Sequence, residues 1–233
     1  MINLQHRSAE KELLDAEHIS FADIKRNMQE LDSINRLLGG HAITLQGVEH
    51  FLPMAQKEIS ICEVGCGGGD NLRAIDRYCK RKGIRATLTG IDIKAECIAF
   101  AAERNKTIPA NWICSDYKLL TFHNAKPDII FSSLFCHHFG ESELVSMMQW
   151  MRENARLGFF INDLHRHSLA YSSIKLLTKL FSASYLVKND APLSVARGFR
   201  KTEWTHIMRA AGIRQYTVNW KWAFRHLVIA KND

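Results

Sequence analysis

Residues 58–70 read EISICEVGCGGGD, and this stretch decides the fold. An apolar run at 59–64 stops abruptly at a glycine-rich turn, and residues 71–80 beyond it have the composition of a helix. Glycine adopts backbone angles that a Cβ forbids, and a helix N-terminus offers free N–H groups with a partial positive charge. A strand, a tight glycine turn and a helix N-terminus in this order predict a nucleotide-binding corner.

The spacing of the glycines discriminates between ligands. In the dinucleotide fingerprint G-x-G-x-x-G, counted from Gly65, the third glycine would stand where the chain has Asp70, whose carboxylate would repel a pyrophosphate. The stretch instead fits acidic-x-G-x-G-x-G with Glu63, Gly65, Gly67 and Gly69, and it resembles motif I of the class I S-adenosylmethionine (SAM) dependent methyltransferases. SAM has no phosphate and carries an amine and a sulfonium, which suit neighbouring acidic residues. The alternative is an ordinary turn between a strand and a helix.

Length and composition describe a globular chain. Its 233 residues are 46% hydrophobic and 24% charged, which predicts one domain with an appendage. No apolar run approaches the roughly 20 residues that span a bilayer, and the first 15 residues lack a signal region, so we expect a cytoplasmic protein without membrane insertion. The net charge of +7 is compatible with RNA, an anionic membrane surface or an acidic substrate, but the charges are spread out, which favours a solvated basic surface.

The cysteines and histidines do not predict a metal site. The six cysteines contain no CxxC pair and lie mostly in apolar segments, which is typical of reduced core thiols. The nearest zinc candidate is Cys136-His137-His138, and it lacks a second ligand pair at metal spacing. We therefore expect no metal.

From Ile59 onward, strand and helix patterns alternate, which indicates a parallel sheet with helices on both faces. The expected strands are 59–64, 86–91, 111–114, 128–132 and 157–162, and the expected helices are 71–82, 94–104 and 141–154. Two closing runs, 213–220 and 223–231, predict an antiparallel hairpin. The family resemblance implies the same α/β architecture: a Rossmann-like class I methyltransferase fold with a mainly parallel seven-stranded sheet and a C-terminal antiparallel hairpin.

Two segments are expected outside this core. Residues 1–55 are interpreted as an N-terminal helical cap on the domain 56–233, with helices over 10–17, 21–38 and 45–52. Ser20 is expected to cap the second of these helices, and Gly39-Gly40 to end it.

Residues 168–197 are interpreted as an insertion over the active site. They contain a helix over 168–181 and then an irregular stretch that Pro192 interrupts. Thr202 is expected to cap a further helix over 203–211.

The ends of the strands supply the candidate cofactor residues, because ligands bind at the carboxyl ends of parallel strands. Asp92 ends the second strand, where it can accept hydrogen bonds from both ribose hydroxyls; NAD-binding folds use the same device, and a simple helix cap is the alternative. By the resemblance, Asp116 takes the adenine amino group, with Tyr117 on the ring, although Asp116 also suits a plain turn. Main-chain groups at Ser133 and Leu134 would contact the methionine part. The full predicted cofactor set is Glu63, Gly65, Cys66, Gly67, Gly69, Asp92, Ile93, Asp116, Tyr117, Ser133 and Leu134.

The candidate catalytic residues are histidines that follow the fourth and fifth strands. His137 and His138, in the sequence CHHF, resemble a motif of menaquinone/ubiquinone-type and related small-molecule methyltransferases. A neutral imidazole can take a proton from a phenol or hydroxyl, and His165 is a further candidate base. The alternative is that one histidine of the pair packs structurally and the other caps a helix.

The predicted substrate-binding residues are Asp163, Arg166 and Tyr171, with Arg166 expected to hold an anionic group of the substrate. Tyr185 is a further candidate for the pocket wall. The alternative for the stretch 162–167 is a polar turn that leads into a capped helix.

Taken together, the residues and the resemblance predict a SAM-dependent methyltransferase that methylates a small aromatic or quinol-like acceptor at oxygen or carbon. RNA or protein methylation is an alternative that the basic charge supports, but the chain has no N/D-P-P-Y/F motif after the fourth strand and no added RNA-binding domain, so nucleic acid is disfavoured. A non-catalytic SAM-binding protein is the third reading. A nicotinamide oxidoreductase comes last, because Asp70 spoils the dinucleotide fingerprint.

Overall fold

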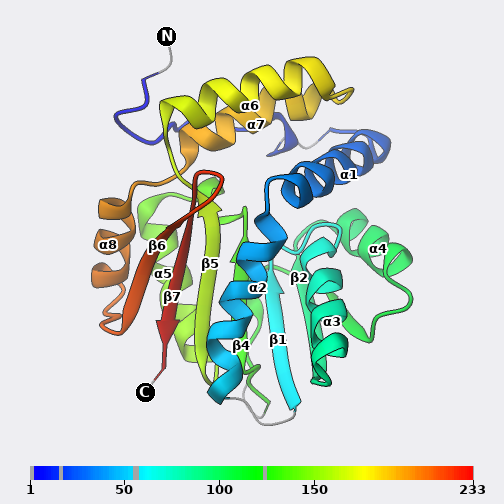
Figure 1. Ribbon diagram of the computed structural model, residues 1–233, viewed down its shortest axis with the longest axis vertical. Helices are drawn as coiled ribbons and strands as arrows, with labels where there is room; N and C mark the ends of the chain where they lie inside the picture. Colours follow the sequence, from blue (N-terminus) through cyan, green and yellow to red (C-terminus); the bar gives the residue numbers. More distant parts are fainter. Residues whose placement is uncertain (1–2, 16–17, 55–57, 123–124, 233) are drawn as a thin grey trace.

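The computed structural model describes residues 3–15, 18–54, 58–122 and 125–232. Its centre is a seven-stranded sheet with the order β3-β2-β1-β4-β5-β7-β6 (Figure 1). The strands are β1 (Glu58–Val64), β2 (Arg85–Asp92), β3 (Ala110–Cys114), β4 (Ile129–Ser133), β5 (Gly158–Leu164), β6 (Tyr216–Lys221) and β7 (Arg225–Lys231). The first five are parallel, β7 is antiparallel to β5, and β6 is antiparallel to β7. The predicted Rossmann-like sheet with its closing hairpin is confirmed.

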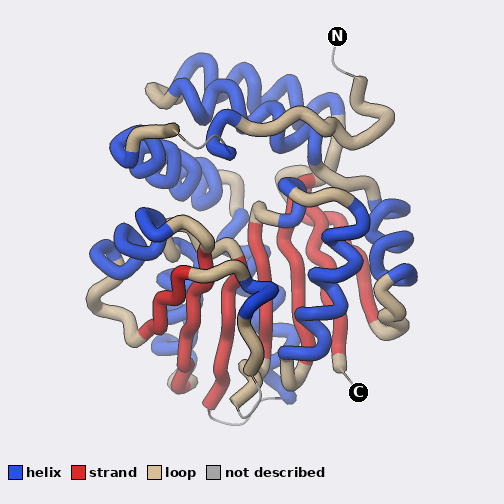
Figure 2. Tube along the Cα trace, turned by 180° about the vertical axis from the view of Figure 1, so that it is seen from behind, coloured by secondary structure: helices blue, strands red, loops and turns tan. Residues whose placement is uncertain are grey.

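Helices cover both faces of the sheet (Figures 1 and 2). The helices α2 (Gly40–Phe51) and α3 (Asp70–Lys82) pack on one face, and α5 (Glu141–Asn154) and α8 (Lys201–Ala210) pack on the other. Strand side chains alternate between the two cores: Phe159 is buried with α5 and α8, while Phe160 is buried with α2 and α3. Because successive side chains of a strand point to opposite faces of the sheet, one buried strand packs against both apolar cores. The helix α4 (Ala95–Arg104) packs at the β2–β3 side.

Three helices and one short turn lie beyond the carboxyl ends of the parallel strands, and we call them the roof. The roof consists of α1 (Phe21–Leu37), α6 (Ser168–Phe181), α7 (Tyr185–Arg197) and the 3₁₀ turn η1 (Leu13–Asp15) (Figure 1). The Ser20 side chain caps α1, as expected, by accepting a hydrogen bond from the Asp23 N–H at 3.2 Å. None of the helices in the described ranges combines the length and the apolar composition that crossing a membrane requires.

Near the N-terminus, the helix bounds differ from the prediction. Of the helix predicted over 10–17, the structure describes residues 10–15, and among these only η1 is helical. Residues 16–17 of this prediction lie outside the described ranges. Gly39, in the left-handed region at φ +75°, separates α1 from α2, so the third helix begins at Gly40 and not at residue 45. A Cβ at Gly40 would lie 1.6 Å from the Asn35 side-chain oxygen, so the close approach of the two helices requires glycine.

Three corrections concern the C-terminal third. The stretch predicted as irregular is the helix α7, which continues through Pro192 because its buried apolar residues, Leu186 and Val187 among them, hold it against the structure below. Thr202 lies inside α8, whose first turn is capped by the Glu203 carboxylate accepting from the Arg200 N–H. The hairpin strands are shorter than predicted, and residues 222–224 connect them.

Candidate active site

A cavity of about 1160 Å³ lies between the sheet and the roof, at the carboxyl ends of the parallel strands. Its walls come from segments far apart in the chain: the N-terminal segment, α1, the glycine loop, the ends of β2 and β4, the hairpin connection, α6 and α7. This is the location that an open α/β sheet provides for a ligand.

The glycine loop forms one wall of the cavity. Gly65, Gly67 and Gly69 all have positive φ, of 71°, 48° and 70°. A Cβ at Gly65 would lie 2.3 Å from the Phe135 ring, and one at Gly69 would lie 2.4 Å from Trp112, whereas Gly67 has nothing within 4 Å of that position. Gly65 and Gly69 are therefore required both by their positive φ and by the lack of space for a Cβ. Gly67 presents its backbone to the cavity without a side chain.

Glu63, at the end of β1, is a buried carboxyl with one unsatisfied oxygen. Its Oε1 accepts a hydrogen bond from Asn71 Nδ2 at 2.8 Å, while Oε2 has no partner among the described residues. Burial and the nearby charges of Asp70 and Asp92 raise the pKa of Glu63 well above its usual range. A ligand cation at this wall would satisfy the unpaired oxygen and favour the carboxylate form.

The other predicted cofactor residues lie along the same cavity. Asp92 accepts from the Gly67 N–H at 2.9 Å and from the Lys94 N–H at 3.0 Å, which links the end of β2 to the glycine loop. Burial raises the pKa of Asp92. Asp116 caps a 3₁₀ turn by accepting from the Lys118 N–H at 3.0 Å. The residues of the predicted cofactor set that line the cavity are Glu63, Gly65, Cys66, Gly67, Asp92, Ile93, Asp116, Tyr117, Ser133 and Leu134.

Two members of the predicted cofactor set have surroundings that the sequence did not indicate. The Tyr117 ring packs edge-on against Trp150, with centroids 5.1 Å apart, and its buried hydroxyl has no partner among the described residues. Gly69 is not part of the cavity wall and instead fits against Trp112.

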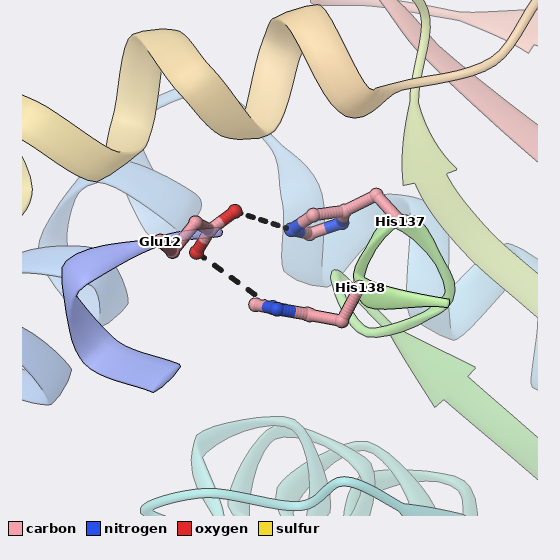
Figure 3. Close-up of side chains that lie close together, drawn as sticks. All are labelled: Glu12, His137 and His138. Carbon is pink, nitrogen blue, oxygen red and sulfur yellow. Dashed lines mark ion pairs between the residues drawn. The ribbon is translucent and has the colours of Figure 1, made fainter. Parts of the chain in front are cut away.

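The paired histidines meet a residue from the N-terminal segment, Glu12 (Figure 3). His137 Nε2 lies 3.5 Å from Glu12 Oε1, and His138 Nε2 lies 3.8 Å from Glu12 Oε2. On its other side, His137 Nδ1 lies 2.8 Å from Asp163 Oδ1, at the end of β5. Glu12 also accepts a hydrogen bond from the Ser194 hydroxyl at 2.7 Å. These contacts form a buried chain of carboxylate, imidazole and carboxylate at the cavity wall.

In the series Asp163, His137 and Glu12, each charged group favours the charged form of its neighbour. Burial alone would lower the pKa of His137, but the Asp163 charge and the hydrogen bonds to Asp163 and Glu12 raise it to about 9. The same pairing holds the pKa values of Glu12 and Asp163 below their usual ranges, despite burial. At neutral pH, His137 is therefore an imidazolium between two carboxylates.

Two arginines fix the turn that carries the histidines. Arg197 of α7 donates to the His137 and His138 carbonyls at 3.0 and 2.7 Å, and Arg7 donates to the His137 and Phe139 carbonyls at 3.1 and 2.9 Å. The N-terminal segment and α7 are thus attached to the histidine turn directly, and Glu12 is brought to it. No local pattern around Glu12 indicated this role.

The three predicted substrate-binding residues, Asp163, Arg166 and Tyr171, all lie outside the cavity wall. Arg166 was expected to hold a substrate anion, but its guanidinium binds the Glu203 carboxylate at 2.7 and 3.0 Å and the Gly198 carbonyl. Asp163 is fully buried and reaches the cavity only through His137. Tyr171 is not among the residues of the wall.

His165 lies in a separate shallow depression with Arg166 and His167. Its ring packs 4.7 Å from that of His226, and burial lowers its pKa. Tyr185 is 53% exposed and is also not in the wall of the main cavity.

Two clusters of described residues have the composition and proximity that a metal ion needs. They are Glu12, His137 and His138, and Asp32, His41 and Asp70, each with ligand atoms within 4.8 Å of one another. Cys136, the zinc candidate next to the histidines in sequence, points instead into the core, with its thiol 3.3 Å from the Ser132 hydroxyl. In the second cluster, Asp32 already binds two arginines. The absence of a metal stays a prediction.

Comparison with known proteins identifies the central part of the chain. Residues 61–158 match the family model described as a methyltransferase domain. This part of the chain is similar to known methyltransferase domains. The matched range runs from β1 to the first residue of β5 and contains the glycine loop, Asp92, Asp116 and the paired histidines. The match supports the prediction of a SAM-dependent methyltransferase, and the predicted domain bounds of 56–233 stay a prediction. A search of the curated proteins found no match.

Solved methyltransferase structures share the fold of the whole chain at low sequence identity. The plantazolicin methyltransferase BpumL in complex with SAH is 18% identical, with a TM-score of 0.68 and 90% of each chain covered. A SAM dependent methyltransferase from Aquifex aeolicus is 18% identical, with a TM-score of 0.62, 92% of this chain covered and 99% of the other. Magnesium protoporphyrin IX methyltransferase (ChlM) from Synechocystis PCC 6803, with bound SAH, is 14% identical, with a TM-score of 0.57, 94% of this chain covered and 90% of the other. These likenesses show that most of the chain has the fold of known methyltransferases.

Proposed function

We propose that this protein is a SAM-dependent methyltransferase that transfers a methyl group to a small aromatic or quinol-like acceptor, at oxygen or carbon. The observation that carries the proposal is one continuous cavity that joins the glycine loop and the acidic strand ends to the Glu12–His137–His138 cluster. The methyltransferase domain and the SAH or SAM present in solved structures of the same fold support the cofactor.

The residues at the glycine loop fit SAM. The unpaired Glu63 Oε2 and the acidic surroundings suit a ligand with an ammonium and a sulfonium, and Gly67 leaves room for close approach to the backbone. In this proposal, Asp92 binds the ribose hydroxyls, Asp116 the adenine edge, and the main chain at Ser133 and Leu134 the methionine part. SAM supplies a methyl group already activated by its sulfonium, so the chain mainly has to align the acceptor with it.

The acceptor end of the cavity is apolar and enclosed. Its wall contains side chains from the turn after β4 and from α6 and α7, among them Phe135, Phe139, Ile174, Leu177 and Val195. Such a surface favours a small ligand with a large apolar area and few polar groups. The mostly apolar lining of the cavity suits a small apolar acceptor better than an RNA or a protein surface, so these acceptors stay the weaker alternative.

The charge state of the cluster divides the catalytic roles. Because the pKa of His137 is about 9, this imidazole is protonated at neutral pH and is a poor base. We assign to it the positioning of Glu12 and the histidine turn. Glu12 is ionised and lines the cavity, and His138 lies beside it with 22% of its side chain exposed. These two are the candidates to take the proton of an acceptor hydroxyl.

Calorimetric titration of the full chain with SAM, SAH and NADH tests the cofactor. We expect binding of both adenosyl ligands and none of NADH. A panel of phenols and quinols, an azole-containing peptide and an RNA transcript then tests the acceptor, with SAH formation as the readout. The acceptor proposal is abandoned if only the peptide or the RNA is methylated, and the whole proposal fails if no adenosyl ligand binds.

A further inference from the structure

Arg225, the first residue of β7, is a buried cation at the cavity wall. Its side chain is 3% exposed, and its guanidinium Nη1 has no hydrogen-bond partner among the described residues. It forms no ion pair within that part of the chain. Burial lowers the pKa of Arg225 to about 10, which still leaves the group charged at neutral pH. A buried charge whose donors lack hydrogen-bond partners is costly, so a bound anion would relieve it.

The surroundings of Arg225 place it at one end of the cofactor region. Arg225 pairs in register with Leu164 of β5, and its guanidinium carbon lies 3.1 Å from the Cβ position of Gly40, at the start of α2. Its charge interacts with those of Asp70, the first residue of α3, and of Asp163. In the strand order, β7 lies on the opposite side of β1 from β2 and β3, whose ends carry Asp92 and Asp116. If those two residues hold the adenosine, Arg225 lies toward the other end of the ligand.

The other cations of the cavity wall are committed elsewhere or exposed. Arg7 and Arg197 donate to the carbonyls of the histidine turn, and the Lys94 ammonium donates to the Leu14 carbonyl at 2.7 Å. Lys11 and Lys118 are exposed. Among the described cations of the wall, Arg225 is the buried one whose donors are available to a ligand.

A ligand carboxylate in this cavity needs such a cation. Asp70 lies in the wall near the glycine loop, and despite burial its contact with His41 lowers its pKa, so this carboxylate would repel the carboxylate of a ligand. A guanidinium held in a fixed position can donate two parallel hydrogen bonds to a carboxylate, which adds geometric selectivity to the charge.

We propose that Arg225 binds the carboxylate of the methionine part of the cofactor, while the acidic residues at the glycine loop receive its ammonium. The site thereby distinguishes SAM and SAH from adenosyl sulfur compounds that lack the carboxylate. This inference rests on the proposed function, because it takes SAM as the ligand.

The test is a comparison of two ligands on three forms of the full chain. The ligands are SAH and its decarboxylated analogue, 5′-deoxy-5′-(3-aminopropylthio)adenosine, and the forms are the natural protein, Arg225→Met and Arg225→Lys. We expect the natural protein to prefer SAH by about 10- to 100-fold, the effect typical of a charge-assisted hydrogen-bonded pair. Arg225→Met should lose that preference through weaker SAH binding, with analogue binding unchanged, and Arg225→Lys should keep part of it.

Thermal unfolding separates this effect from damage to the fold. Since Arg225→Met removes a buried charge without a partner, the unfolding temperature of the ligand-free protein should stay equal or rise. Arg209→Met, at an exposed position of α8, is the matched control and should leave the affinity for both ligands unchanged. Unchanged SAH affinity in Arg225→Met, or equal loss for both ligands, overturns the inference while leaving SAM binding intact. Failure of the natural protein to bind either ligand overturns the proposed function itself.

Discussion

At the residue scale, the site depends on charges that the fold brings together from distant parts of the chain. Asp163, His137 and Glu12 come from the end of β5, the turn after β4 and the N-terminal segment. The histidines could be nominated from the sequence because they follow a strand in a parallel sheet. The protonation of His137 could not, because it depends on Asp163 and Glu12, which are remote in sequence and take part through tertiary contacts. The same holds for Arg166, whose partner Glu203 lies in α8.

The raised pKa of His137 predicts a pH-dependent stability. A group whose pKa is higher in the folded than in the unfolded protein stabilises the folded state. For His137 this stabilisation is complete below pH 6.5, the usual pKa of histidine, and it is lost as the pH rises toward about 9. The upper bound is about 3 kcal/mol, at 1.36 kcal/mol for each pKa unit. We expect the unfolding temperature of the natural protein to fall across this window, relative to that of His137→Gln.

Thermal unfolding followed by circular dichroism between pH 5 and 10 measures this difference. His206→Gln, whose imidazole is largely exposed on α8, serves as the control and should keep the slope of the natural protein. If the unfolding temperatures of His137→Gln and of the natural protein change with pH in the same way, His137 is not held protonated in the folded protein.

Glu12 provides a second residue-scale prediction, on turnover. Glu12→Gln keeps the size of the side chain but removes the proton-accepting charge, and general base catalysis typically contributes 10²- to 10⁴-fold. With a phenolic acceptor found in the screen, we expect kcat to fall by about 100-fold while SAH affinity changes by less than about threefold. Glu10→Gln, at an exposed position two residues earlier, should leave both values unchanged. Full turnover in Glu12→Gln together with a large loss in His138→Gln would move the base to His138.

At the element scale, local patterns predicted the strands and most helices, and tertiary packing decided the remainder. The alternation of strands and helices from β1 to β5 could be predicted because each element shows its own periodicity. The helix α7 was missed because Pro192 usually breaks a helix interior, at a cost of about 3 kcal/mol. Its fully buried residues Leu186, Val187 and Ala196 offset that cost, and their burial is a property of the folded protein alone.

Asp32 carries an element-scale prediction, because it attaches α1 to the body of the protein. Its Oδ2 accepts from Arg73 of α3 at 2.8 Å and from Arg104 of α4 at 2.6 Å. Asp32→Asn leaves two guanidinium groups close together without their carboxylate, and we expect a loss of about 1–2 kcal/mol in the free energy of unfolding. SAH affinity should fall severalfold, since α1 lines the cavity.

Urea unfolding and calorimetric titration with SAH test this prediction. Glu103→Gln changes a neighbouring exposed carboxylate and should leave stability and affinity unchanged. Equal behaviour of the two variants would mean that α1 is held by other contacts.

At the scale of the whole molecule, the cavity separates two parts of unequal packing. Below it, the sheet and its covering helices enclose two apolar cores. Above it, the helix α6 of the roof buries little: Ala170 and Thr178 are buried, while Leu169, Leu176, Leu180 and Phe181 are exposed. Segments with few buried apolar contacts open at lower free energy than the core, so α6 should be the part of the roof that moves to admit ligands.

Ligand binding should therefore stabilise the roof more than the sheet. An occupied cavity gives α1, α6 and α7 contacts that they lack when it is empty, and a ligand at 100 times its Kd stabilises the folded state by about 2.7 kcal/mol. Hydrogen–deuterium exchange with saturating SAH should show slower exchange in α1 and the glycine loop, because these line the proposed cofactor end. Amides of β4 and β5 should change only in the slow exchange that reports global unfolding. An acceptor added with SAH should extend the protection to α6 and α7, whose side chains line the apolar end. Protection of the glycine loop with no change anywhere in the roof would contradict this picture, and the roof would then be a fixed wall.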